Sequence, residues 1–427
     1  MLRPKFLLLL LPGLASLAFC AALRASASGV CDPHAYGAKV NGTSKDTAAI
    51  QAAIDACERR GGGVVRLTPG TWLSAPIVLK SNVTLQLDQG AILLASSDHQ
   101  DYPPKMEFRA PGLRSLVSAT DATHVSITGK GVIDGAGESW WQEARSVDDH
   151  GVMGSDKPRP RLVVFDHCRH VLVEGVTIQN SPMWQLVPYY SDDVTIRNIK
   201  ILAPQHSPNT DAIDPFSSSH VRIDHVYADV GDDDVAIKSG EANSPGPDDP
   251  SRDITITDCI FLHGHGLSVG SELAGGAQNI RAERIHFDGT DNGIRIKANR
   301  DRGNDVSALL FRNIDMKNVK NAIIISEYYP KILPPDPDPP QPVTRLTPHF
   351  HAITLENVTA TDIASAGAIA GLPEAPIRDV VLKHVRIDAQ HGLAISNADV
   401  SAERLTVHAS DEGPPITKGA GGNLALH

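Results

Sequence analysis

The chain has 427 residues, a hydrophobic fraction of 41% and a formal net charge of −11. This negative charge argues against nucleic acid and anionic membrane surfaces as partners. The length alone predicts two or three compact domains, unless the chain forms one elongated repeat. The 35 glycines, 30 prolines and many short runs of valine and isoleucine favour strands and turns over helices.

The first 27 residues have the pattern of an export signal. Arg3 and Lys5 precede an apolar run over residues 6–19, and small residues up to Ala27 offer a cleavage site. A membrane anchor is disfavoured, because the run is shorter than about 18 residues and is interrupted by Pro12 and Gly13. We expect an exported protein, periplasmic or extracellular, that is free of the membrane once residues 1–27 are removed.

Four cysteines follow that cleavage site, namely Cys31, Cys57, Cys168 and Cys259. None lies in a CxxC pair, so a zinc site is not expected. In an exported protein Cys31 and Cys57 could form a disulfide near the N-terminus, and buried free thiols are an equal alternative. The sequence leaves this choice open.

One phrase of alternating apolar and polar residues recurs along the chain. Examples are NVTLQL from residue 82, HVLVEGVTI from 170, DVTIRNIKI from 193 and DITITDCIF from 253. A period of two marks strands with one buried face. From Val171 the phrase returns after 23, 27, 33 and 26 residues, and such periods are typical of a solenoid. We predict an all-β fold, a single-stranded right-handed parallel β-helix over residues 28–410.

Three segments depart from this pattern. Residues 51–63 predict a short amphipathic helix that ends in glycines and caps the open N-terminal end of the solenoid. Residues 328–342 contain too many prolines for a helix or strand and predict a long extended loop. Residues 411–427 are rich in glycine and proline, and we expect a loose C-terminal tail.

Four motifs with charged residues fall on consecutive coils. They are SPNTDAID from residue 207, VGDDDVAIKSG from 230, GHGLSVGS from 264 and GIRIKANRDRG from 293. Asp211 precedes Asp232 by 21 residues, Asp233 precedes His265 by 32, and His265 precedes Arg295 by 30. Residues one coil apart stack at about 4.8 Å. We therefore expect one face to collect Asp211, Asp232, Asp233, His265, Arg295 and Lys297.

The three consecutive acids at residues 232–234 repel one another, so a fold accepts them only where a strand breaks toward a cleft. Closely spaced carboxylates suit glycoside hydrolysis, in which one carboxyl group donates a proton and others act on water. Arg295 and Lys297 suit a carboxylate on the substrate. Alone, each motif has a simpler interpretation, such as a solvated turn, a calcium loop or a strand edge. Their common order and spacing make coincidence a poor explanation.

The four motifs resemble the signature of the polygalacturonases, the family 28 glycoside hydrolases, and in particular bacterial members. That family's NTD, [GQ]DD, GHG and RIK motifs match residues 209–211, 231–233, 264–266 and 295–297. The likeness covers roughly residues 30–410 and includes GVIDGAGESWW from residue 131 and SPMWQL from 181. One departure is Asp234, where the family often has cysteine, and this third acid complicates which group holds the proton.

The resemblance implies a right-handed parallel β-helix that hydrolyses α-1,4-galacturonosyl bonds in pectic polysaccharide with inversion, without a cofactor or metal. It implies that Asp232 is the general acid, supported by His265, and that Asp211 and Asp233 hold and deprotonate the water. Substrate contacts implied in the same way are Arg295, Lys297, Asn209 and Tyr329. We expect the chain to act as a monomer.

Two other functions remain open at this point. A calcium-dependent pectate lyase would use the aspartates for calcium and Arg295 as base, and a sugar-binding β-helix would need only the surface. The sequence also leaves open whether the polysaccharide is cut internally or from an end, and whether it is galacturonan, rhamnogalacturonan or xylogalacturonan. The loop at residues 328–342 would favour cleavage from an end if it closes the cleft.

Overall fold

The structure, a computed structural model, describes residues 29–146 and 157–427. The predicted export signal at residues 1–27 lies outside the described residues. Within the described ranges, no helix has both the length and the apolar character needed to cross a membrane.

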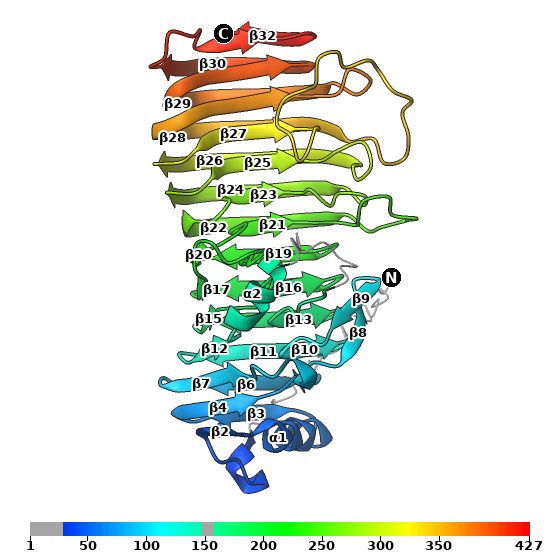
Figure 1. Cartoon of the computed structure of the whole chain (residues 1–427), viewed down its shortest axis with the longest axis vertical. Coiled ribbons are helices and arrows are strands. Elements are labelled where there is room, and N and C mark those ends of the chain that lie inside the picture. The colour runs from blue at the N-terminus through cyan, green and yellow to red at the C-terminus, as the bar shows by residue number, and fades with distance from the viewer. Residues whose placement is uncertain (1–28, 147–156) are drawn as a thin grey trace, which may run out of the picture.

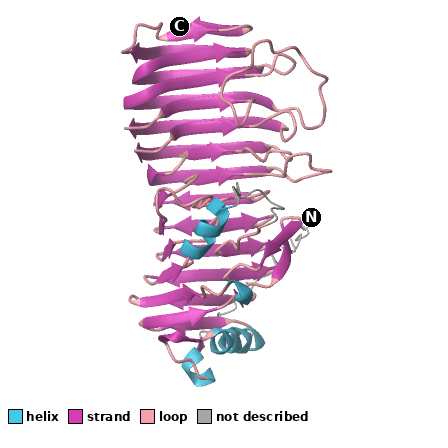
Figure 2. Cartoon of the chain, in the orientation of Figure 1, coloured by secondary structure: helices cyan, strands magenta, loops and turns pink. Residues whose placement is uncertain are grey.

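The chain winds into an elongated parallel β-helix whose successive coils stack along one axis (Figure 1). Strands dominate the molecule, and the few helices lie outside the stacked coils (Figure 2). The prediction of a single-stranded right-handed parallel β-helix is confirmed. The strands form three stacks, because each strand pairs in parallel with the equivalent strand of the next coil.

The first stack begins with short strands and continues with the first parts of longer ones. Its members in chain order are β1 (Val30–Cys31), β3 (Gly63–Leu67), β6 (Val83–Leu87), β11 (Thr123–Gly129), β14 (Arg169–Glu174), β17 (Asp192–Arg197), β19 (Ser219–Asp224), β22 (Ser251–His263), β24 (Ala277–Asp288), β26 (Asp305–Lys317), β28 (His349–Ala370), β29 (Ile377–Ser396), β30 (Ala398–Ala409) and β32 (Gly422–Leu426).

The second stack follows the first around each coil. It contains β2 (Asn41–Lys45), β4 (Gly70–Ser74), β7 (Ala91–Ala95), β12 (Val132–Asp134), β15 (Thr177–Gln179), β18 (Lys200–Leu202) and β20 (Tyr227–Val230). From β22 onward the strand turns the corner without a break, so one long strand serves both stacks.

The third stack carries the polar motifs. It contains β5 (Ile77–Val78), β10 (Val117–Thr120), β13 (Val163–Asp166), β16 (Leu186–Tyr189), β21 (Val235–Ile237), β23 (Leu267–Val269), β25 (Asn292–Lys297), β27 (Asn321–Ser326), the last parts of β28 and β29, and β31 (Ile416–Lys418). The coil between β16 and β21 joins the stack only through bridges at Ile213 and Phe216.

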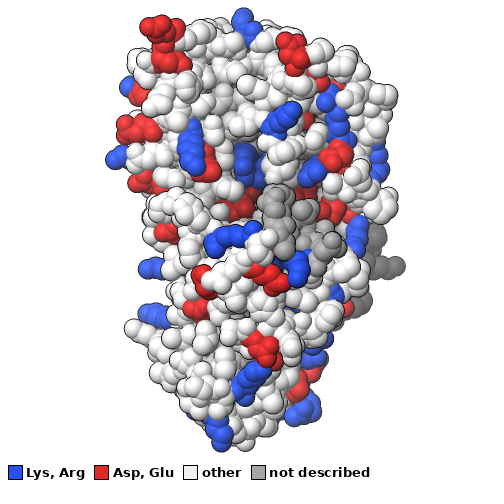
Figure 3. Space-filling view, in the orientation of Figure 1, with Lys and Arg blue, Asp and Glu red and all other residues white. Residues whose placement is uncertain are grey.

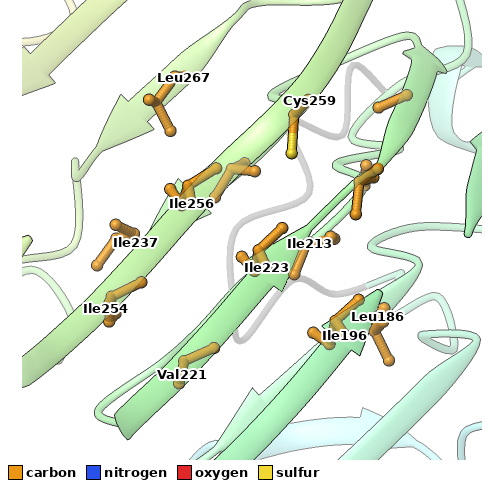
Figure 4. Packing of buried hydrophobic residues seen from close by; sticks show 14 of the residues in the cluster. Leu186, Ile196, Ile213, Val221, Ile223, Ile237, Ile254, Ile256, Cys259 and Leu267 are labelled. Atoms are coloured by element: carbon orange, nitrogen blue, oxygen red, sulfur yellow. The ribbon is translucent and has the colours of Figure 1, made fainter. Parts of the chain in front are cut away.

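The core is a column of apolar side chains that runs the length of the solenoid. Apolar residues of the stacked strands point inward, and Leu186, Ile213, Ile237 and Leu267 come from successive coils of the third stack (Figure 4). These side chains are fully buried. Inward alternation therefore leaves the intervening residues of the same strands on the outside.

The recurring phrase identified in the sequence begins with a residue in the left-handed conformation. His170, Asp193, His220 and Asp253 all have φ between 52° and 56°. Aspartate and histidine, together with asparagine, are several-fold enriched in this region. They produce the same local kink in each coil, which explains why these residue types open the phrase.

Helix α1 (Thr47–Arg59) packs on β1 and β3 and covers the N-terminal end of the solenoid (Figure 1). The predicted capping helix therefore exists, although it begins at Thr47 and ends before the glycines, since Gly63 already belongs to β3. Cys31 and Cys57 form a disulfide that ties α1 to β1. Cys168 and Cys259 are buried free thiols.

The remaining elements lie outside the stacks. They are the helix α2 (Glu138–Ser146), the short 3-10 helices η1 (Pro33–Tyr36) and η2 (His99–Asp101), and the antiparallel hairpin of β8 (Pro104–Glu107) and β9 (Ala110–Leu113). The segment 328–342 is an extended loop, as predicted, and projects from the side of the solenoid (Figure 1).

The expectation of a loose C-terminal tail is wrong. Within residues 411–427, β31 pairs with β29 and β32 pairs with β30, so the tail adds strands to the solenoid. The physical reason lies in Ile416 and Leu424, which pack against the core, while the glycines and prolines form the turns between strands.

Candidate active site

The four polar motifs meet on the third stack, where its strands begin and end. Asp211 precedes the bridge at Ile213, Asp232 and Asp233 lie between β20 and β21, and His265 lies between β22 and β23. The register pairs Ala236 with Ser268 and Ser268 with Arg295. Residues separated along the chain by whole coils therefore become neighbours, as the sequence predicted.

The expected strand break occurs at the three acids. The chain bends at residues 231–234 before β21 resumes, and Asp232 and Asp233 both reach the cleft. Asp234 is fully buried, and one of its oxygens accepts a hydrogen bond from the Gly266 N–H at 3.1 Å. Burial raises the pKa of Asp234 well above its usual range, and this third acid is not among the residues that line the cleft.

The two glycines of the GHG motif fix the position of His265. Gly264 and Gly266 have φ of +64° and +84°, a region that favours glycine. A Cβ on Gly266 would lie 1.9 Å from the carbonyl oxygen of Asn292 on the next coil. The His265 N–H donates to the carbonyl of Asp232 at 2.8 Å, so the backbone itself holds the histidine beside the acids.

Asp233 is the centre of the most tightly paired cluster. Its Oδ1 accepts from Arg295 Nη2 at 2.6 Å and from Ser268 Oγ at 2.8 Å, and its Oδ2 accepts from Lys297 Nζ at 2.9 Å. Arg295 Nε also donates to Ser268 Oγ at 3.0 Å. Burial opposes the ionised form, yet Arg295 and Lys297 outweigh it and hold the pKa of Asp233 far below its usual range.

Asp232 pairs with His265, whose Nδ1 lies 2.8 Å from Asp232 Oδ1. Burial alone would lower the pKa of His265, but the charge of Asp232 and this hydrogen bond outweigh burial and raise that pKa. Burial disfavours ionised Asp232, and the charge and hydrogen bond of His265 reverse this effect and lower its pKa. The ionised form of Asp232 and the protonated form of His265 therefore stabilise each other.

Asp211 lies in a second carboxylate group, together with Asp214 and Glu272. Lys238 Nζ is 3.6 Å from Asp211 Oδ2, 3.6 Å from Asp214 Oδ1 and 3.2 Å from Glu272 Oε2. Burial and the neighbouring Asp232 raise the pKa of Asp211 well above its usual range. Burial also raises the pKa of Asp214 to about 7.

Asn209 and Tyr329 line the same cleft. The Asn209 side-chain oxygen accepts from Arg159 Nη2 at 2.8 Å. The Tyr329 ring lies beneath two cations, with Lys297 Nζ at 5.2 Å and the Arg302 guanidinium at 5.8 Å from its centre. Both residues are thus held in place by contacts with basic side chains.

The cleft has a volume of about 900 Å³ and crosses successive coils from Trp184 to Tyr329. Basic and acidic side chains lie side by side at mid-height of the face in Figure 3. All eight predicted site residues come together: seven line the cleft, and Arg295, whose side chain is 16% exposed, donates a hydrogen bond to Asp233.

Sequence reasoning missed four residues of the site, Asp214, Lys238, Ser268 and Glu272. Lys238 belongs to the AIKSG segment, which directly follows the three acids in the sequence. Its strand position, paired with Phe216 of the preceding coil, places it in the third stack with the other site residues. Ser268 follows from the pairing of β23 with β25, which places it next to Arg295. Asp214 and Glu272 had no signal beyond their charge, because they lie in irregular segments.

Asp232, Asp233 and His265 offer three ligand atoms within 4.8 Å of one another, a set that could hold a divalent cation. However, Arg295 and Lys297 already bind both oxygens of Asp233. Their positive charges would repel a metal ion there. These residues therefore fit a calcium ion poorly.

Comparisons with known proteins agree with this geometry. Residues 72–406 match the model of the glycosyl hydrolases family 28. The chain is 32% identical over 369 residues to a probable polygalacturonase of Vitis vinifera, covering 82% of this chain and 73% of the relative. It is also 32% identical over 306 residues to an endo-polygalacturonase of Pectobacterium carotovorum, covering 68% and 73%. The structure of an exopolygalacturonase from Thermotoga maritima superposes with a TM-score of 0.76 at 26% identity, over 92% of both chains.

Proposed function

The chain belongs to family 28 of the glycosyl hydrolases, and we propose that it hydrolyses α-1,4-galacturonosyl bonds of pectic polysaccharide with inversion of configuration. The observation that carries this proposal is the meeting of Asp211, Asp232 and Asp233 in one cleft with Arg295 and Lys297. Such a site combines acid–base groups with a receptor for an anionic sugar.

The Asp232–His265 pair supplies the proton for the leaving oxygen. The raised pKa of His265 and the lowered pKa of Asp232 favour the imidazole as the holder of the proton of this pair. The carboxyl form of Asp232 is the form that protonates the glycosidic oxygen. In this proposal His265 passes its Nδ1 proton to Asp232 Oδ1, 2.8 Å away, as Asp232 gives a proton to the glycosidic oxygen.

Asp211 is the better base of the two acids assigned to the water. A group with a higher pKa accepts a proton more readily, and the pKa of Asp211 is raised whereas that of Asp233 is strongly lowered. Both oxygens of Asp233 are engaged by cations. In this proposal Asp233 orients the water and the cations, and Asp211 removes the proton.

The substrate carboxylate binds at Arg295 and Lys297, next to Asn209 and Tyr329. Arg295 and Lys297 both pair with Asp233, so two cations face this one carboxylate. Arginine contributes a forked donor and lysine a point charge. This excess of charge explains how a chain with a net charge of −11 can accept an acidic polymer.

Export to the periplasm or the extracellular space is part of the same proposal. The Cys31–Cys57 disulfide supports it, because disulfides persist in oxidising compartments. Pectic polysaccharide is a large substrate that an exported monomeric enzyme would meet outside the cytoplasm.

The test uses the chain from residue 28 onward with de-esterified polygalacturonate. We expect new reducing ends, no ultraviolet-absorbing unsaturated product and full activity in the presence of a calcium chelator. Proton NMR of the fresh products should show the β-anomer first. A chelator-sensitive, unsaturated product would instead establish a lyase, and binding without release of reducing ends would establish a sugar-binding protein.

Chromatography of the products over time distinguishes the two modes of cleavage. Monomer from the first minutes means attack at chain ends, and mixed oligomers mean internal attack. Deleting residues 331–342 tests whether the extended loop closes the cleft. If it does, the deletion should shift the products from monomer toward oligomers. Unchanged product lengths would remove that role from the loop.

A further inference from the structure

Lys238 and Lys297 occupy the same outward column of the third stack, two coils apart. Lys238 pairs with Phe216 below it, and Lys297 pairs with Ser326 above. Gly270 occupies the coil between them, where a Cβ would lie 1.9 Å from the carbonyl oxygen of Lys297. Both lysines are almost fully buried at the floor of the cleft. Two similar cations thus stand at equivalent positions of one site.

Their surroundings differ in charge. Lys297 shares Asp233 with Arg295, so two cations face one carboxylate. Lys238 lies within 3.6 Å of three carboxylates, those of Asp211, Asp214 and Glu272. A substrate carboxylate would have to compete with these three acids for Lys238, whereas it meets excess positive charge at Lys297.

The Lys238 side chain is also fixed in place. Its Nζ lies 4.7 Å from the centre of the Trp184 ring, in a cation–π contact. Burial would lower the pKa of Lys238, but the acids around it outweigh burial and raise the pKa well above its usual range. The acids and the Trp184 ring therefore both favour the charged form of the Lys238 amine. The other ionisable groups around Lys238 and Asp211 are Asp232, Asp233, Glu241, Lys297 and Tyr329.

We propose that Lys238 is a positioning residue that fixes the charge and orientation of the Asp211 carboxylate, and that it does not bind the substrate. This rests on the proposed function, in which Asp211 is the base that acts on water. Without the cation, Asp211 would share a buried site with Asp214 and Asp232 and would take up a proton more readily. A protonated Asp211 cannot activate water.

The first test is the variant Lys238→Met, which keeps the length of the side chain and removes its charge. We expect kcat to fall about 100-fold or more, and KM to stay within about threefold. Asp211 must be ionised to act, so removing the cation should move the acid limb of the pH profile of kcat/KM to higher pH. Lys297→Met is the matched control, for which KM should rise and the acid limb should stay.

Lys238→Arg keeps the positive charge and should retain the acid limb of the unmodified chain. If Lys238→Met does not fold, this arginine variant decides. If the pH profile of Lys238→Arg has the acid limb of the unmodified chain, the proposal is supported. If this variant loses kcat at an unchanged melting temperature, the proposal is overturned. A folded Lys238→Met with an unmoved acid limb, or with a raised KM alone, also overturns it.

The pKa of Asp211 can be measured without catalysis, and this measurement separates the inference from the proposed function. Carbon NMR of chain labelled at aspartate Cγ follows the titration of Asp211, whose signal is identified by its loss in Asp211→Asn. We expect a higher pKa for Asp211 in Lys238→Met than in the unmodified chain. An unchanged titration would overturn the role of Lys238, whereas a missing hydrolysis of polygalacturonate by the unmodified chain would overturn the function instead.

Discussion

Two groups of the same residue types lie on neighbouring coils but on different sides of the solenoid. Asp232, Asp233 and His265 lie in the cleft, and Asp224, His225 and Asp258 lie at the corner between the first and second stacks. In each group the ligand atoms lie within 4.8 Å of one another. Composition and spacing therefore do not distinguish them.

Burial distinguishes the two groups. On the outer surface, Arg284 binds both oxygens of Asp258 at 2.7 Å, and about half of the arginine is exposed. Water screens such charges, and the pKa of Asp224 and of Asp258 is lowered there. In the cleft, burial and Asp232 raise the pKa of the nearby Asp211, whereas Arg295 and Lys297 lower that of Asp233, so acids with different neighbours move in opposite directions. A pair of acids with separated pKa values can donate and accept protons. The two acids of the surface group, Asp224 and Asp258, do not form such a pair, because the pKa of each is lowered.

The largest expected effect is the loss of the acid in the cleft. Asp232→Asn should lower kcat by a factor of about 10² to 10⁴ and leave the melting temperature unchanged. The amide keeps the shape of the carboxyl group but cannot donate the required proton. Asp258→Asn, the surface counterpart, should keep the kcat of the parent; steady-state kinetics on polygalacturonate compares the two.

The second effect concerns stability. Asp233→Asn leaves the partly buried Arg295 and the buried Lys297 without their shared carboxylate. Removing one partner from a buried ion pair destabilises a fold by about 3–5 kcal/mol, and denaturant unfolding followed by circular dichroism measures it. A change as small as that of Asp258→Asn would show that water or another acid reaches these cations.

The third effect is the pH dependence of kcat/KM. Protonation of Asp211 should remove activity as the pH falls through its raised pKa, so the acid limb should lie above the ordinary aspartate value of about 3.9. Deprotonation of His265 should remove activity as the pH rises through its raised pKa, which gives an alkaline limb above about 6.5. His265→Gln should abolish the alkaline limb, and His225→Gln should move neither limb. An acid limb at the ordinary aspartate pKa would contradict the assignment of Asp211 as base.

The smallest effect is expected on the outer surface. Arg284→Ala removes both bonds to Asp258, yet solvent already screens this exposed pair. Calorimetry should find the melting temperature unchanged within error, at both low and high salt. A clear loss of stability would mean that the surface group holds the corner between the first and second stacks.

The sequence predicted the solenoid and the meeting of the four motifs because both follow from periodicity. Alternation specifies which side of a strand is buried, and coil length specifies which residues stack. Asp214 and Glu272 could not be found in this way, since they lie in irregular segments whose course depends on tertiary contacts. The burial of Asp234 could not be predicted either, because the three acids look alike until the bend at residues 231–234 turns one of them inward. The C-terminal strands were not predicted, because the glycines and prolines of residues 411–427 are typical of loops, whereas Ile416 and Leu424 pack against the core.

The left-handed residue that opens each coil has a consequence for the tolerance of the molecule to change. The inward strands repeat with the same kink at His170, Asp193, His220 and Asp253, while the intervals between them differ by up to ten residues, from 23 to 33. All of this variation is absorbed by the connecting turns. Such a molecule can lengthen or exchange one rim segment at a time and so acquire a new preference among polymers, while its backbone scaffold stays as it was.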